Sequence, residues 1–485
     1  MKKQIEKYEG KGGFESFLGW MQEAHLCYEV SVREVLKKNF MSLPNLVRPS
    51  FLKHIIDLHP FESIYYRVSK YFKSERLRRV FTFGSMYMGM SPYEAPGTYQ
   101  LLQYTELAEG IWYPVGGFHA VVQALVNVCE RLGVDIRLNT AVKEVLLSAD
   151  GKTATGVRLA NGETLNADIV VVNADLVYAY NNLFPKSKVS KSTTNYAKSL
   201  QKRDGSCSSI SFYWSLKQQV PELTTHNIFL ADEYKGSFDQ IFKDQNIPDE
   251  PSFYVNVPSR VDPTAAPEGK DSIVVLVPVG HLLNATSHDP EINEGKGLLK
   301  EQDWEQLISS VRSTIQHTIE TRTKCAPLAP LIVNEVVNNP YTWEEKFNLD
   351  KGSILGLSHS FWNVLAFRPK TKHAEIKNCY FVGASTHPGT GVPIVLAGAK
   401  ITTEQIFEDL GIEIPWAKKG PVVQDLGVDQ SRAGSLDKRR ARWGYTDLLY
   451  WGFILLALWS LVRSGLVPGV GKHSKTVITI TKEVK

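Results

Sequence analysis

The stretch 378–398, NCYFVGASTHPGTGVPIVLAG, most constrains what this chain can fold into. Its apolar run 379–382 predicts a short strand, and Gly389 and Gly391 predict a tight turn after it. Pro393 then predicts the first turn of a helix, which apolar residues continue at helical spacing. A strand, a glycine turn and a helix N-terminus direct unpaired backbone N–H groups to one point. Such a point suits a phosphate, a sugar or an electron-rich ring edge.

Length, charge and cysteine content limit the classes of protein to which the chain can belong. Its 485 residues allow two domains or one large discontinuous domain. The 55 lysines and arginines against 51 acidic residues give a formal net charge of +4, which does not support nucleic-acid binding. The 5 cysteines are odd in number and form no C-x-x-C pair, and the histidines lack ligand spacing. We therefore expect no disulfide framework, no metal site and a reducing compartment for the main body.

The first long segment, 14–83, has the apolar spacing of amphipathic helices. Within it, 51–56 and 65–73 mix basic with aromatic residues. Such helices can pack on a core and leave a basic edge in water, or they can face a membrane, where lysine stems and aromatic rings both lie at headgroup depth. The sequence leaves both interpretations open.

A block of methionines and tyrosines follows at 85–118. Its members are Met86, Tyr87, Met88, Met90, Tyr93 and Tyr99. A stripe of this kind is most often core, but soft and aromatic side chains also suit a long flexible hydrocarbon. The turn residues Gly116 and Gly117 then predict a helix over 121–132.

The segment 134–175 has β character. Asp150-Gly151 and Asn161-Gly162 predict hairpin turns, and the β-branched run 169–172 predicts a strand covered on both faces. Further along, 208–216, 253–257 and 273–277 predict strands, and 304–321 predicts a helix. These elements favour an α/β fold with a mixed sheet backed by helices.

The C-terminal part changes in composition. Residues 412–442 are polar and rich in glycine and proline, which is typical of a linker, and they end in the basic cluster 438–442. The apolar run 448–462 follows. It is short for a membrane span, so a buried helix is the alternative, but its tryptophans and its position beyond a linker favour a transmembrane anchor over 443–470. The basic cluster before it predicts that the main body lies on the cytosolic side.

The residue order in 378–398, 85–118 and 134–175 resembles that of the bacterial and fungal phytoene desaturase family of FAD enzymes. The resemblance implies a discontinuous, Rossmann-like FAD-binding domain and a substrate domain of mixed sheet and helices, to which the apolar run adds a C-terminal membrane helix. It also implies that the block 85–118 lies at the junction of the two domains, which favours contact with the substrate. We expect the following boundaries: 14–110 and 186–345 for the substrate domain, 111–185 and 346–411 for the FAD domain, 412–442 for the linker and 443–470 for the anchor.

The resemblance also implies which residues hold the cofactor. The cofactor-binding residues would be Val142, Gly383, Ala384, Gly389, Gly391, Val392 and Pro393. His387 lies within the same turn and is the candidate catalytic residue, as a proton acceptor or charge stabiliser. Glu94 and Glu106 are further carboxylate candidates, for which we expect a buried hydrogen-bonding role.

One part of the family pattern is not found. Members of the family begin with a strand, a G-x-G-x-x-G turn and a helix that hold the FAD pyrophosphate. Residues 1–13 are polar, without the apolar region of a signal peptide, and Glu15 stands where the third glycine would be expected after Gly10 and Gly12. We therefore expect that the chain lacks this segment and that its FAD-binding domain is incomplete.

The function implied by the resemblance is carotenoid biosynthesis. Phytoene would be dehydrogenated stepwise to lycopene-type carotenoids by FAD-dependent oxidation of CH–CH groups, with oxygen or a quinone as the electron acceptor. The expected partners are phytoene, partly desaturated carotenoids and membrane lipid, and the expected location is the endoplasmic reticulum membrane. Two alternatives stay open: a related flavoprotein such as a carotenoid isomerase or amine oxidase, and an inactive, membrane-tethered fragment that does not bind FAD.

Overall fold

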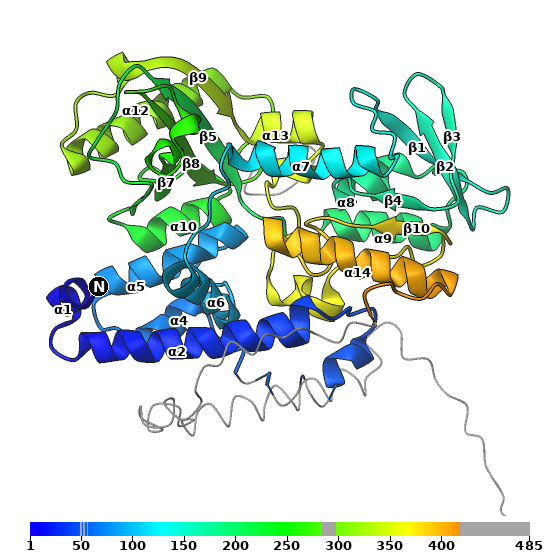
Figure 1. Cartoon of the computed structure of the whole chain (residues 1–485), viewed down its shortest axis with the longest axis horizontal. Helices are drawn as coiled ribbons and strands as arrows, with labels where there is room; N and C mark the ends of the chain where they lie inside the picture. The colour runs from blue at the N-terminus through cyan, green and yellow to red at the C-terminus, as the bar shows by residue number, and fades with distance from the viewer. Residues whose placement is uncertain (49–50, 52–53, 56, 284–296, 418–485) are drawn as a thin grey trace, which may run out of the picture. The chain divides into compact units, whose positions relative to one another are not determined.

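Alternating apolar residues build the largest sheet of the protein. In the computed structural model its five strands lie in the order β6-β7-β8-β5-β9, and every neighbouring pair is antiparallel (Figure 1). The strands are β5 (Ser208–Leu216), β6 (His226–Phe229), β7 (Phe253–Asn256), β8 (Asp271–Val279) and β9 (Ile332–Asn338). Helix α12 (Trp304–Thr323) buries Val311, Ile315 and Ile319 against one face of this sheet. The predicted strands and the predicted helix of this region are confirmed, with ends shifted by a few residues.

The structure describes residues 1–48, 51, 54–55, 57–283 and 297–417. These residues belong to one compact unit, Met1–Lys418. The predicted anchor 443–470 and most of the predicted linker 412–442 therefore lie outside the described residues. Among the described helices, none has both the length and the apolar character needed to cross a bilayer. The proposed domain boundaries remain a prediction.

Two smaller sheets are in contact with each other. An antiparallel meander consists of β1 (Val142–Leu147), β2 (Ala154–Leu159) and β3 (Thr164–Asn166), which confirms both predicted hairpins. Strands β4 (Val170–Val172) and β10 (Cys379–Phe381) form a parallel pair, in which Val170 is opposite Cys379. Both sheets contribute to one core with helices α8 (Leu176–Tyr178) and α9 (Lys191–Gln201).

The parallel pair is less covered than the sequence predicts. Val170 and Val172 are buried, but Val171 between them is 46% exposed. The expectation that 169–172 is covered on both faces is therefore wrong. Helix α7 (Gly117–Arg131), whose apolar side chains would suit such a cover, has no buried residue at all. A β-branched run indicates a strand, but it does not say which elements lie against it.

A separate helical part precedes these sheets in the sequence. It contains α1 (Lys2–Glu9), α2 (Gly13–Ser31), α4 (Ile64–Ser69), α5 (Glu75–Thr82) and α6 (Leu101–Tyr104). Helices α1, α2, α4 and α5 share a core that includes Phe17, Trp20, Val68, Phe72 and Phe81, whereas Leu101 of α6 packs against a different core. The remaining helices are α10 (Tyr234–Phe242), α13 (Pro340–Phe347) and α14 (Val392–Leu410).

The methionine and tyrosine block contributes mainly to the interior. Met86 packs with Phe83 and Tyr234 in one core, and Met90 packs in the core of the helical part. For these two methionines the core interpretation is therefore correct. Tyr87 differs from them, because part of its side chain is exposed.

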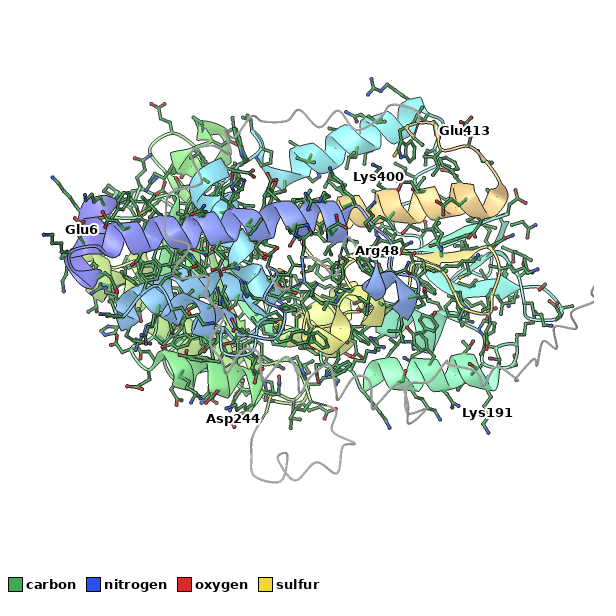
Figure 2. All side chains as sticks on the ribbon, turned by 90° about the horizontal axis from the view of Figure 1, so that it is seen from below. Glu6, Arg48, Lys191, Asp244, Lys400 and Glu413 are labelled. Carbon is green, nitrogen blue, oxygen red and sulfur yellow. The ribbon has the colours of Figure 1, made fainter. Side chains whose placement is uncertain are left out.

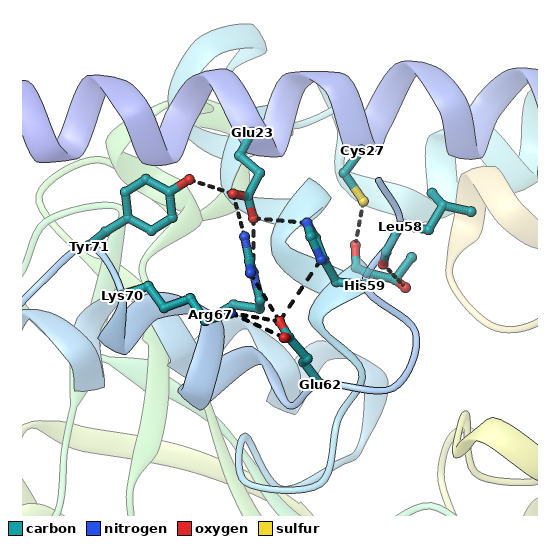
Figure 3. Close-up of polar contacts among 9 residues, drawn as sticks. Glu23, Cys27, Leu58, His59, Glu62, Arg67, Lys70 and Tyr71 are labelled. Atoms are coloured by element: carbon teal, nitrogen blue, oxygen red, sulfur yellow. Dashed lines mark hydrogen bonds and ion pairs between the residues drawn. The ribbon is translucent and has the colours of Figure 1, made fainter. Parts of the chain in front are cut away.

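A buried ion network connects α2 with α4 (Figure 3). The Arg67 guanidinium donates to both carboxylate oxygens of Glu23, at 3.1 and 2.6 Å, and to Glu62 at 3.0 Å. The Tyr71 hydroxyl donates to Glu23 as well, and Lys70 pairs with Glu62 at 3.1 Å. Burial alone would raise the pKa of Glu23, but the charge and hydrogen bonds of Arg67 outweigh it and hold that pKa below its usual value. Arg67 is therefore the residue that keeps Glu23 ionised inside the protein.

We predict that Arg67→Met lowers the unfolding free energy by about 3 kcal/mol, because it leaves the buried Glu23 carboxylate without its cation. Lys70→Met is the matched control, since it removes a more exposed cation from the same network and costs less than about 1 kcal/mol. Denaturation midpoints of the two variants and the parent chain measure both effects. Equal midpoints for both variants would contradict the assigned role of Arg67.

Candidate functional site

The glycine turn lies where two parallel strands end. Strand β10 runs directly into Gly383, and β4 runs into Asn173. The two ends are adjacent, because a Cβ built on Gly383 would lie 3.0 Å from Oδ1 of Asn173. The Val382 N–H still donates to the Val172 carbonyl at 3.1 Å, so the pairing continues up to the turn. Ligands of open α/β sheets bind outside the carboxyl ends of parallel strands, which is this position.

The turn has the backbone shape that the sequence predicts. Gly383, Gly389 and Gly391 have φ angles of 126°, 136° and 106°, a region that favours glycine. Helix α14 begins at Val392 directly after the turn, with Pro393 in its first turn. The predicted strand, turn and helix start are thus confirmed.

The turn presents free backbone donors. The N–H groups of Gly383, Ala384, Gly391 and Val392 donate no hydrogen bond to any residue that the structure describes. The last two also belong to the start of α14, where the helix dipole adds partial positive charge. Val392 is 50% exposed, so the end of the turn is open. Free donors beside an open, partly apolar helix start fit the electron-rich edge of a ring system such as a flavin.

Apolar side chains around 111–138 are left uncovered. The exposed ones include Trp112, Val115, Phe118, Val122, Leu125, Leu132 and Leu138. Several of them lie on α7, and Trp112 is 87% exposed. Large exposed apolar surfaces are typical of places where a protein contacts another segment or a ligand.

His387 connects the turn to the helical part. The end of α2 and the helical turn η1 (Val32–Leu36) lie close to the start of α14 (Figure 2). Just beyond η1, the Lys38 carbonyl accepts a hydrogen bond from Nε2 of His387 at 2.8 Å. Burial lowers the pKa of this histidine to about 4, so the ring is neutral at physiological pH. The geometry gives His387 a structural contact, and its catalytic role remains a prediction.

The other candidates lie apart from the turn in sequence. Val142 is the first residue of β1, where it lies opposite Leu159 of β2, and it is 38% exposed. Glu94 is exposed. Glu106 is half-buried in η5 (Thr105–Glu109) and accepts a hydrogen bond from the Tyr87 hydroxyl, while burial raises its pKa to about 7. This matches the hydrogen-bonding role expected for Glu106.

Two buried residues under the turn were not singled out from the sequence. The Arg368 guanidinium donates to the carbonyls of Ala384 and Thr386 at 2.5 and 2.9 Å. The His359 Nε2 accepts the Thr390 N–H at 3.2 Å. The only signal in the sequence is an arginine enclosed by apolar residues in 364–369, VLAFRP, which indicates a buried cation but not its partners.

Comparisons with known proteins find similar sequences and structures. A model of the family described as flavin containing amine oxidoreductase matches residues 9–406. The phytoene desaturase of Fusarium fujikuroi is 60% identical over 443 residues, which cover 90% of this chain and 76% of that protein. The phytoene desaturase of Neurospora crassa is 58% identical over 424 residues, covering 86% and 69%. Among solved structures, an oxidoreductase from Methanosarcina mazei is similar over 74% of both chains, with 15% identity and a TM-score of 0.49.

We predict that Gly389→Ala disrupts the turn. The new Cβ would lie 2.4 Å from Nε2 of His359, which is buried and accepts the Thr390 N–H. Overpacking and the positive φ together are expected to lower the free energy of unfolding of this variant by about 2 kcal/mol or more. The absorbance of bound flavin is expected to fall as well.

Gly411→Ala is the matched control for this prediction. Gly411 also has a positive φ, 68°, but a Cβ there meets nothing within 4 Å. Gly411→Ala is therefore expected to lower the free energy of unfolding by only about 1 kcal/mol, through backbone strain, and to cause no loss of flavin. The same loss of flavin in both variants would show that backbone strain alone, and not the contact with His359, explains the effect.

Proposed function

This chain belongs to the phytoene desaturase family of flavin-containing amine oxidoreductases, and we infer from this that it is an FAD-dependent oxidoreductase that desaturates phytoene in carotenoid biosynthesis. The observation that carries the inference is the turn 383–391, whose free N–H groups lie between the ends of two parallel strands and a helix N-terminus. The substrates are phytoene and partly desaturated carotenoids.

The reaction requires a group that the side chains cannot provide. Desaturation removes hydrogen from adjacent carbons of an unactivated chain, and no amino-acid side chain accepts a hydride. FAD supplies that acceptor when it is bound. The contribution of the protein is to hold the reacting carbons in place, to keep water out and to stabilise developing charge.

In the proposed site the chain's own residues have three tasks. The N–H groups of Gly383, Ala384, Gly391 and Val392 would bind the electron-rich edge of the flavin ring. Val392 would contribute apolar surface beside it. Val142 would offer its backbone to the adenine end of the cofactor. We propose oxygen or a quinone as the final electron acceptor.

We propose that the FAD-binding domain is discontinuous and that a further strand completes it. Within the described residues, β10 is the only strand that pairs with β4. The backbone N–H and C=O of Val171 point to the other edge of β4, where a further strand could pair with them. A strand–G-x-G-x-x-G–helix segment would fit this edge, would cover the apolar residues of α7 and would add donors for the pyrophosphate.

We predict that such a segment, fused ahead of Met1, raises FAD affinity at least about tenfold, because each pyrophosphate hydrogen bond adds more than about 1 kcal/mol. The control carries the same strand and helix with alanines in place of the three glycines, so that it can pair with β4 but excludes the pyrophosphate. Flavin fluorescence titration measures both affinities. If neither fusion changes the affinity, the open edge of β4 is not the binding place.

For the part of the chain beyond residue 417 we propose a membrane anchor. The support is the apolar run 448–462 after the basic cluster 438–442, which favours a single span with the catalytic body in the cytosol. A substrate as apolar as phytoene dissolves in lipid, so a membrane such as the endoplasmic reticulum is the proposed location. Release of the chain from membranes by alkaline extraction would contradict this proposal.

The product pigments test the proposed activity. In a host that makes phytoene but has no desaturase of its own, expression of this chain is expected to convert colourless phytoene into coloured lycopene-type carotenoids. Chromatography and absorption spectra count the double bonds formed. An isomerase would change only the geometry of existing double bonds, and an inactive chain would leave phytoene unchanged, so either outcome would contradict a desaturase.

A further inference from the structure

Arg368 is a fully buried cation in contact with the turn. Its guanidinium donates to five backbone carbonyls in two segments. Three of them belong to 357–363, namely Leu357 at 3.2 Å, Ser358 at 3.1 Å and Asn363 at 2.6 Å. The other two are the turn carbonyls of Ala384 and Thr386. One side chain therefore joins the turn to a separate loop.

The charge of Arg368 has no counterion in the described part of the chain. None of the ion pairs there includes this guanidinium, and its five acceptors are all neutral carbonyls. Burial lowers its pKa to about 10, so it stays protonated at neutral pH. Burying an unpaired charge is costly, and carbonyl dipoles offset only part of that cost. A purely structural crosslink would not need a charge at this place, since neutral donors could also bind carbonyls.

The hydrogen bonds of Arg368 also set the direction of the turn's amides. In a planar trans peptide the C=O and the following N–H point in opposite directions. Because the Ala384 carbonyl points at the guanidinium, the N–H of Ser385 points away from it, and that N–H has no partner among the described residues. His359 acts on the other half of the turn, where its Nε2 accepts the Thr390 N–H.

We propose that Arg368 is a positioning residue of the cofactor site: it holds the Ala384 and Thr386 carbonyls inward, so that the Ser385 N–H faces the ligand, and it supplies a fixed positive charge to that ligand. The proposal rests on the proposed flavin-dependent function. Accepting a hydride adds one negative charge to the acceptor, and a buried cation held nearby favours that change without reorganisation.

Two variants separate the two parts of this role. Arg368→Lys keeps the charge but loses most of the five hydrogen bonds, and Arg368→Met loses both. Arg203→Lys is the matched control. Arg203 donates to the Phe367 carbonyl at 2.8 Å and to Oδ1 of Asn363 at 3.3 Å, so it holds the same loop without contacting the turn.

The first measurement needs no cofactor. Hydrogen exchange of the peptide covering 383–391 is expected to be at least about tenfold faster in both Arg368 variants, because charge-assisted hydrogen bonds of about 1.5–3 kcal/mol are lost. Arg203→Lys is expected to leave this peptide unchanged. Unchanged exchange in both Arg368 variants, or equally faster exchange in the Arg203 control, would overturn the positioning role.

The second measurement tests the charge. The reduced-to-oxidised ratio of bound FAD, equilibrated against a redox dye, is expected to fall about tenfold in Arg368→Met and by less than about threefold in Arg368→Lys. Equal ratios in parent and both variants would overturn the electrostatic part. A parent chain that binds no FAD would contradict the proposed function instead, and hydrogen exchange would still decide whether Arg368 positions the turn.

Discussion

The parallel pairing of β4 with β10 is the constraint on which the candidate site depends. Parallel neighbours end at the same edge, and this brings Asn173 next to Gly383 although about two hundred residues separate them. All five strands of the large sheet lie between β4 and β10 in the sequence. The site is therefore a product of long-range pairing as well as of local glycine geometry.

The sequence predicts most accurately those conformations that depend on a few neighbouring residues. The strand, turn and helix start in 378–398 are correct because glycine at positive φ and proline in the first turn of α14 carry their own conformational preference. The hairpins at 150–151 and 161–162 are correct for the same reason. The partners of Arg368 could not be predicted, since they are backbone carbonyls, which carry no side-chain signal. The pairing of Glu23 with Arg67 likewise depends on how α2 and α4 pack.

Composition was a weaker guide to exposure. The β-branched run 169–172 predicts a strand with two covered faces, yet Val171 is exposed. Conversely, Met86 and Met90 looked suited to a hydrocarbon, yet both belong to hydrophobic cores. In each case the residue type indicates that the side chain prefers apolar surroundings. It does not show whether another element, a ligand or the protein interior provides them.

The uncovered surface and the open turn have a common physical consequence. A helix of the length of α7 gains little stability from its own hydrogen bonds, and in proteins most of its stability comes from packing of its apolar face, but α7 buries no residue. A segment that pairs with the free edge of β4 and covers α7 would stabilise both elements at once. It would also bring further backbone donors to the end of the sheet where Gly383 lies. Folding of this part of the chain and binding of its cofactor are therefore expected to be coupled, because the same contacts contribute to both.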